Sequence, residues 1–103
     1  MSLSYVLTAA AEEDLRLIVR YTRKQWGDAQ VRSYVARIER GILDVATGQG
    51  AFKDVSDLHP GLCVTRCEYH YIFCLARASK PALIAAIFHE RMDLMTRLES
   101  RLA

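Results

Sequence analysis

Apolar residues recur at helical spacing through most of the first half of the chain. In residues 9–26 and again in residues 28–46 they return every three or four positions, which predicts two amphipathic helices. The first apolar stripe consists of Ala11, Leu15, Ile18, Thr22 and Trp26, and the second consists of Val31, Val35, Ile38, Ile42 and Val45. The short joint between them predicts an antiparallel helical hairpin.

Local signals mark where these helices begin and end. Leu3 to Leu7 alternates in polarity and predicts a short strand, after which Thr8 is the expected N-cap of the first helix. Gly27 suits the end of that helix, and Asp28 is the expected N-cap of the second.

The second half of the chain has the pattern of strands. Residues 62–66, 69–76 and 82–88 are predicted strands, with one turn near Cys67 and Glu68 and another at "RASKP". The segment from Thr47 to Gly61 is a long loop that we expect to be pinned to the core by Phe52, Val55 and Leu58. "DLMTRLESRL" predicts a short terminal helix with Asp93 as its cap and with Leu94, Leu98 and Leu102 on one side.

Both faces of the last two strands are apolar. In one strand Tyr69, Tyr71, Phe73 and Leu75 oppose His70, Ile72, Cys74 and Ala76; in the other Ala82, Ile84, Ala86 and Phe88 oppose Leu83, Ala85 and Ile87. An antiparallel sheet with one wet face normally alternates with polar residues. Two explanations stay open: the terminal helix and the long loop cover the second face, or another chain covers it.

Composition narrows the class of protein. A length of 103 residues with 51% hydrophobic content predicts one compact domain, and a net charge of +2 permits nucleic-acid contact without arguing for it. Three cysteines without CxxC spacing predict buried free thiols and a reducing, cytoplasmic setting. We expect neither a secretion signal nor a membrane span.

Polar residues with chemical potential gather near the predicted sheet. Arg66, His70, His89, Glu90 and Arg91 could together move protons and stabilise a developing negative charge, as RNA cleavage requires. A histidine on an otherwise apolar face, such as His70, is more typical of a hydrogen-bonded, half-buried side chain than of a general base. The sequence has no Gly-rich phosphate loop, no zinc spacing and no nucleophile triad, so we expect no cofactor and no metal.

Four short motifs carry a family resemblance. "Y-x-L-T-x-x-A-x-x-D-L", "Y-T-x-x-x-W-G", "H-Y-I-F" and the final "H-x-R-M-D" occur in this order, and together they resemble the ParE branch of the RelE/ParE toxin superfamily. The resemblance covers nearly the whole chain. It implies an α+β fold, in which a small curved antiparallel sheet carries an N-terminal helical hairpin and a short C-terminal helix.

The resemblance also implies partners. Toxins of this branch act on DNA gyrase and are neutralised by a ParD-like antitoxin that wraps the toxin, which would supply a cover for the apolar surface. The resemblance implies that the terminal motif contacts gyrase. The candidate contact residues are His89, Arg91, Met92 and Asp93. Candidate contacts of the antitoxin are Trp26, Ile72, Cys74, Leu83 and Leu98. We expect no membrane partner and no sequence-specific binding of nucleic acid by this chain alone.

Two other functions stay open. The sister RelE branch cleaves messenger RNA on the ribosome, and an enzyme of that type would use His70, Arg91 and Arg66 here. No tyrosine follows Tyr71, although that branch uses one in its C-terminal region, and this argues against cleavage. A third reading is an inactive relative that only binds its antitoxin and helps to repress the operon.

Overall fold

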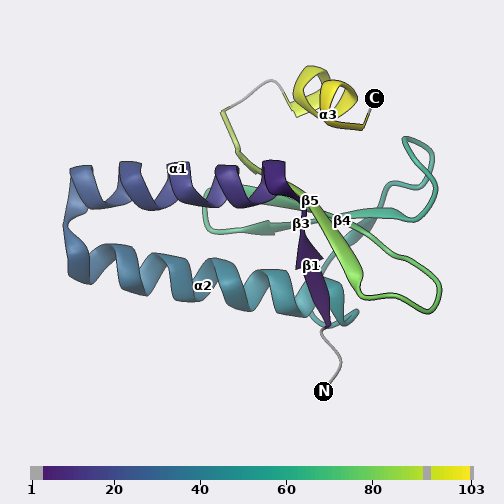
Figure 1. The fold of residues 1–103 in the computed structure, drawn as a ribbon, viewed down its shortest axis with the longest axis horizontal. Helices are drawn as coiled ribbons and strands as arrows, with labels where there is room; N and C mark the ends of the chain where they lie inside the picture. The colour runs from purple at the N-terminus through teal and green to yellow at the C-terminus, as the bar shows by residue number, and fades with distance from the viewer. Residues whose placement is uncertain (1–3, 92–93, 103) are drawn as a thin grey trace.

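The computed structural model describes residues 4–91 and 94–102 as a sheet that is packed against helices on both faces (Figure 1). Five strands and three helices follow one another in the order β1, α1, α2, β2, β3, β4, β5, α3. Their bounds are β1 Tyr5–Leu7, α1 Ala9–Trp26, α2 Asp28–Ala46, β2 Lys53–Asp54, β3 Leu62–Cys67, β4 His70–Leu75, β5 Ala82–His89 and α3 Leu94–Leu102. The expected α+β fold is confirmed, and none of the helices in these ranges is long and apolar enough to cross a membrane.

Single residues set the start and the turn of the helical hairpin. The Thr8 side chain accepts a hydrogen bond from the Ala11 N–H at 3.0 Å, which confirms Thr8 as the N-cap of α1. Gly27, at φ 87°, forms the whole joint between the helices because it is both the C-cap of α1 and the N-cap of α2. The prediction that Asp28 caps α2 is therefore wrong: Asp28 is already helical, and its carboxylate pairs with Arg23 at 3.0 Å.

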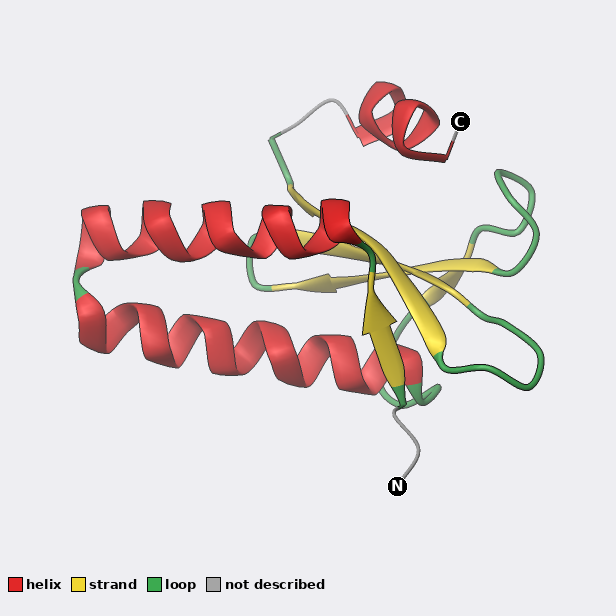
Figure 2. Ribbon diagram, viewed as in Figure 1, coloured by secondary structure: helices red, strands yellow, loops and turns green. Residues whose placement is uncertain are grey.

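The sheet has the strand order β1-β5-β4-β3-β2. Figure 2 shows its strands beside the two long helices of the hairpin. The neighbours β3, β4 and β5 pair antiparallel, as expected, and the β3–β4 turn lies at Glu68 and Tyr69. β2 also pairs antiparallel with β3, although it lies in the segment that was predicted to be a loop. β1 pairs parallel with β5, an arrangement that a hairpin cannot form and that the long connection between these two strands permits. β1 reaches only as far as Ile84 along β5, so the rest of that edge of β5 has no strand beside it.

A bulge in β5 corrects one part of the predicted alternation. Phe73 pairs with Ala86 while the next residue, Cys74, pairs with Ile84, so Ala85 is an extra residue in β5. The extra residue shifts the alternation of side chains between the two faces of the sheet by one position. Ile84 and Ile87 consequently share a face, and the prediction that Ile84 lies on the same face as Ala86 and Phe88 is wrong.

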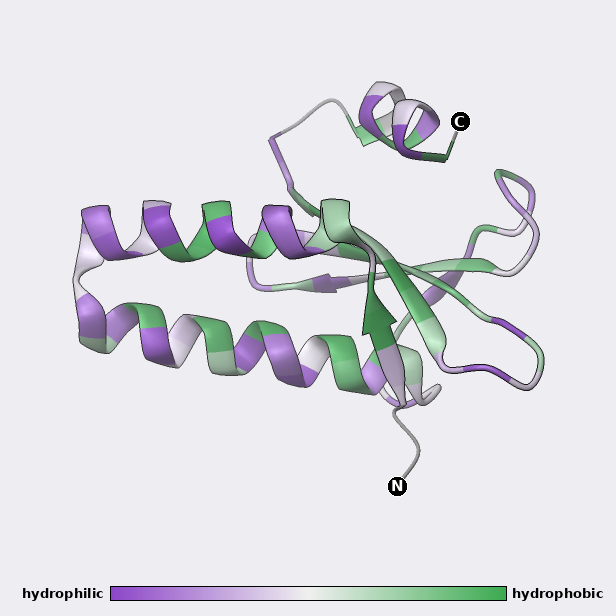
Figure 3. Ribbon diagram, in the orientation of Figure 1, coloured by the Kyte–Doolittle hydropathy of each residue, from purple (hydrophilic) through white to green (hydrophobic). Residues whose placement is uncertain are grey.

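The first core lies between the hairpin and the sheet. Its buried members come from α1, α2, β4 and β5, and the apolar positions of both helices alternate with polar ones as Figure 3 shows. They are Ala11, Ile18, Tyr34, Ile38, Ile42, Val45, Ile72, Cys74, Ile84 and Ile87. Gly41 permits the close approach of α2 to β3, because a Cβ at this position would stand 2.8 Å from the Cys67 sulfur. All three cysteines are free, and burial raises the pKa of each thiol, that of Cys74 to about 12.

The second core lies on the opposite face of the sheet, under α3. Leu62, Phe73, Ala86, Phe88 and Leu98 are buried there, and Leu94 and Leu102 pack against them. The terminal helix thus supplies much of the cover that the apolar second face requires. The long loop contributes Val55, but Phe52 and Leu58 are exposed, so the prediction that they pin the loop is wrong. The loop is held by strand β2 on β3 instead.

Candidate functional site

A groove of about 750 Å³ runs between α1, the start of α2 and the uncovered edge of β5. We call it the aromatic groove. The β3–β4 turn and the end of β5 close it on one side. It is lined by Asp14, Leu17, Ile18, Tyr21, Thr22, Trp26, Gln30, Tyr34, Arg37, Glu68, Tyr69, His70, Ile87, His89 and Arg91.

Large side chains in this groove are open to solvent. Trp26 is 71% exposed, Tyr21 64% and Tyr69 59%. Trp26, the last member of the apolar stripe predicted for α1, is therefore not part of the core. The turn between the two helices lies at the end of the hairpin farthest from the sheet, so the last residues of α1 have no strand beneath them (Figure 1). Exposed aromatic residues grouped in one groove are typical of a surface that binds another protein.

The floor of the groove is a polar network in an otherwise apolar setting. His70 is only 8% exposed, and its Nδ1 lies 2.8 Å from the Tyr34 hydroxyl. The Tyr69 N–H donates to the same hydroxyl at 3.3 Å, so Tyr34 ties the β3–β4 turn to α2. The His89 ring meets the His70 ring edge to face, with 5.2 Å between the ring centroids.

Burial sets the protonation of this network. It lowers the pKa of His70 to about 4, with a further lowering by His89 and an opposing effect of Glu90 and Asp14. Burial likewise raises the pKa of Tyr34. At neutral pH both side chains are uncharged. The assignment that satisfies both contacts has the Tyr34 hydroxyl donating to Nδ1 of His70 while its oxygen accepts from Tyr69.

His89 and Arg91 of the terminal motif lie at the rim of the groove. His89 Nδ1 accepts a hydrogen bond from the Arg91 N–H at 3.1 Å, and both side chains line the groove. Arg91 is exposed, and its guanidinium has no ion-pair partner within residues 4–91 and 94–102. Met92 and Asp93, the other two candidates for target contact, lie outside the described residues.

The residues of a possible nuclease are separated by the sheet. In the β3–β4 register Arg66 pairs with Tyr71, and Cys67 pairs with His70, so Arg66 and His70 point to opposite faces. Arg66 forms an ion pair with Glu90 and lies 6.0 Å from the Tyr71 ring centroid. His70 and Arg91 share the aromatic groove without Arg66. The three candidates for RNA cleavage therefore do not converge on one substrate position.

The five candidate contacts of an antitoxin differ in accessibility. Ile72 and Cys74 lie in the first core and Leu98 in the second, each at 2% exposure or less. Alternation along β4 placed Ile72 and Cys74 on a face that the helical hairpin covers, so they offer no contact surface in this structure. Leu83 is half-buried between β1 and β4. Of these five residues, Trp26 alone lines the groove.

Sequence reasoning missed several groove residues. Tyr34 follows Val31 by three positions and precedes Ile38 by four, so the helical period already contained the signal for its burial. Tyr21 and Leu17 carry no such signal, because their exposure depends on what lies beside α1. Within the described part of the chain, no group of three or more His, Cys, Asp or Glu side chains could hold a metal ion.

Comparison with known proteins gives consistent matches over almost the whole chain. The family model described as ParE toxin of type II toxin-antitoxin system, parDE, matches residues 5–94. The chain is 63% identical to Toxin ParE of Escherichia coli over 99 residues, which is 96% of each chain. It is 24% identical to Toxin ParE1 of Mycobacterium tuberculosis (strain CDC 1551 / Oshkosh) over 91% of this chain and 96% of that one. In fold, it matches a chain of the chromosomal ParDE TA system from P. aeruginosa with a TM-score of 0.68, at 19% identity, over 86% of this chain and 95% of the other.

Proposed function

The chain belongs to the family of ParE toxins of type II toxin–antitoxin systems, and from this premise we propose that it inhibits DNA gyrase by binding and that a ParD-like antitoxin neutralises it. Inhibition of this kind needs a docking surface and no catalytic residues. The end of β5 supplies candidate contacts for gyrase in His89 and Arg91. Arg91 is suited to that role because its side chain is exposed and a guanidinium pairs with a partner's carboxylate in two-point geometry.

The aromatic groove is the observation that carries the antitoxin part of this proposal. Trp26, Tyr21 and Tyr69 are exposed around a hollow whose floor is the buried Tyr34–His70 pair. Aromatic side chains of this kind dominate the binding energy of protein interfaces when a partner desolvates them. An antitoxin segment that inserts apolar side chains beside Trp26 would bury surface that the toxin alone leaves in water.

RNA cleavage is the weaker alternative on the same geometry. Arg66 is held on the far face of the sheet by Glu90 and Tyr71, so it cannot share a scissile phosphate with His70. His70 is neutral at pH 7 and could accept a proton, but its Nδ1 is engaged by Tyr34. General acid–base cleavage requires both groups to reach the reacting atoms.

The test is a titration of the purified chain into a DNA gyrase supercoiling and cleavage reaction. We expect supercoiling to fall and cleaved DNA to accumulate, and we expect a stoichiometric amount of the ParD-like antitoxin to reverse both. A folded chain that leaves gyrase unaffected would remove the gyrase proposal. Cleavage of messenger RNA on ribosomes by the same preparation would establish the alternative.

A further inference from the structure

The solvent-facing side of α1 is basic from Arg16 onward, after the exposed acids Glu12 and Glu13 in its first turns. The nine residues from Arg16 to Lys24 include four cations and no acid, whereas the whole chain has a net charge of +2. This short segment therefore carries +4, and all other residues together carry −2. A charge separation of this size within so small a protein creates a local field that attracts polyanions.

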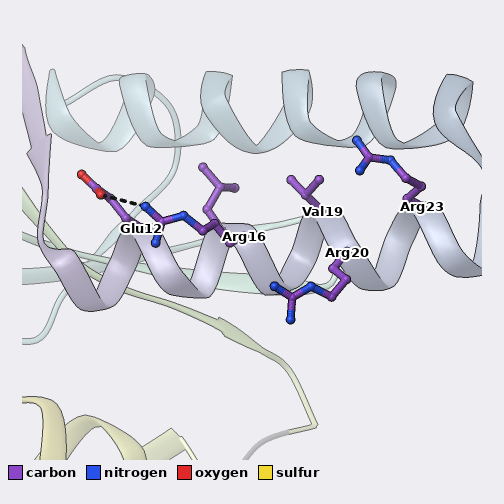
Figure 4. Close-up of a pocket in the computed structure, with 6 residues that line it drawn as sticks. Glu12, Arg16, Val19, Arg20 and Arg23 are labelled. Carbon is purple, nitrogen blue, oxygen red and sulfur yellow. Dashed lines mark ion pairs between the residues drawn. The ribbon is translucent and has the colours of Figure 1, made fainter.

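The four cations form one stripe. At 3.6 residues per turn, Arg16, Arg20, Arg23 and Lys24 fall within about 100° of the helix circumference, opposite the buried side of α1. Three of them border a hollow of about 520 Å³, together with Glu12, Leu15 and Val19. Figure 4 shows Arg16, Arg20 and Arg23 on successive turns of α1, with the Arg20 and Arg23 side chains on either side of the helix in this view. We call this surface the basic stripe.

The ion pairs that the basic stripe already forms contribute little stability. Arg16 pairs with Glu12 at 3.5 Å and with Glu13 at 3.1 Å, and Arg23 pairs with Asp28 at 3.0 Å, but every one of these side chains is more than half exposed. Exposed pairs stabilise a protein by little and exchange readily for a better partner. Arg20 and Lys24 have no ion-pair partner in the part of the chain that the structure describes.

We propose that the basic stripe binds the phosphate backbone of DNA without reading its sequence. Arg16 and Arg23 are separated by about 10 Å along the helix axis, a length over which one strand of B-DNA carries about three phosphates. Arginine suits this partner because its planar guanidinium pairs with phosphate in two-point geometry. This surface is separate from the aromatic groove, and the inference does not depend on the proposed action on gyrase.

The composition of the surface favours a nucleic acid over an acidic protein. A protein interface normally needs a central aromatic or aliphatic anchor. The exposed aromatics of the hairpin, Tyr21 and Trp26, line the aromatic groove instead. The apolar residues of the basic stripe's hollow, Leu15 and Val19, are already half-buried. Contact here would thus be electrostatic, which is the mode of sequence-independent DNA binding.

The test measures binding of the purified chain to a fluorescently labelled DNA duplex of about 30 base pairs and mixed sequence, without gyrase, at several salt concentrations. We expect the affinity to fall as salt rises. The double variant Arg20→Gln, Lys24→Gln should bind about tenfold more weakly, and the slope of log K against log salt should shrink by about 2, since each lost phosphate contact removes about 0.9. Both positions are exposed, and an unchanged thermal unfolding curve would show that the variant is folded.

The matched control is Lys53→Gln, Lys80→Gln, which removes the same charge from two exposed positions on β2 and the β4–β5 turn. It should retain the wild-type affinity within about twofold. Equal loss in both double variants would overturn the proposal, because net charge rather than the basic stripe would then be responsible. Absence of DNA binding at 50 mM salt would also overturn it. If Arg20→Gln, Lys24→Gln weakens binding of the antitoxin and leaves DNA binding unchanged, the surface belongs to an acidic protein segment and the DNA proposal fails.

Discussion

Asp14 and Arg101, 87 residues apart in the chain, form a two-point ion pair that joins α1 to α3. The two contacts are 2.9 Å and 3.1 Å long, and the side chains are only 13% and 24% exposed. Asp14 also accepts the Ile87 N–H at 3.0 Å, and Arg101 donates to the Ala85 carbonyl at 3.0 Å. These backbone groups lie on the edge of β5 that β1 is too short to cover. The ion pair therefore replaces the hydrogen bonds of a missing strand.

Replacing Arg101 by Ala should lower the free energy of unfolding by about 2–4 kcal/mol. The substitution leaves a largely buried carboxylate without its cation, removes a hydrogen bond to Ala85 and removes the guanidinium that lies 4.9 Å from the Phe88 ring centroid. Urea unfolding measures the loss. Arg97→Ala, at an exposed position on the same helix, is the control and should change stability by less than about 0.5 kcal/mol. Equal stability of the two variants would contradict the role of the pair.

His70 should make the stability of the protein depend on pH between 6.5 and about 4. Its pKa falls from an ordinary value of 6.5 to about 4 in the folded chain, because burial disfavours the charged ring. In that window the unfolded chain binds a proton that the folded chain does not. Stability is therefore complete above pH 6.5 and falls as the pH drops, by at most about 1.4 kcal/mol per pH unit and about 3 kcal/mol in total.

The measurement for His70 compares urea unfolding of the wild type and of His70→Gln from pH 7.5 to pH 4.5. Acidic groups affect both proteins alike, so the difference between their pH profiles isolates the histidine. The wild type should lose more stability than the variant across this range. Parallel profiles would mean that His70 is protonated equally in both states.

Trp26→Ala should weaken antitoxin binding by tenfold or more while the thermal unfolding temperature stays within about 2 °C of the wild type. The indole is 71% exposed, so its removal opens no cavity in the free toxin, and a Trp that anchors an interface contributes about 2 kcal/mol, which exceeds the 1.4 kcal/mol of a tenfold change in affinity. Titration calorimetry with the antitoxin provides the measurement. Phe52→Ala, a second exposed aromatic outside the aromatic groove, should bind as the wild type does. Loss of binding in both variants would place the interface elsewhere.

Arg91→Ala should abolish inhibition of gyrase and leave the fold intact. The side chain is exposed, and its backbone N–H, which donates to His89, is retained in the variant. The supercoiling assay measures the activity, and circular dichroism checks the fold. Arg97→Ala serves again as the charge-matched control and should remain inhibitory. A folded Arg91→Ala protein with full activity would remove this residue from the target contact.

Much of the fold could be predicted from the sequence because it depends on interactions between residues that are close in the chain. Thr8 caps α1 with an oxygen three residues from its donor, and Gly27 reverses the chain within one residue. The faces of β4 followed from simple alternation, which placed Phe73 and Ile72 in different cores. Fewer residues of the candidate site could be predicted from the sequence. Helical periodicity placed Trp26 in the apolar stripe of α1, but periodicity gives the direction of a side chain and not what lies in that direction.

The sequence by itself determined the three helices, the strands other than β2, and the family, since these depend on spacing and short motifs that neighbouring residues create. Only the tertiary structure decided that Ala85 shifts the faces of β5, that Arg66 and His70 are separated by the sheet, and that Asp14 meets Arg101. The physical reason is the same in each case. Strand register, the length of the hairpin beyond the sheet and contacts between distant side chains are set by packing between elements, and no local pattern along the chain encodes them.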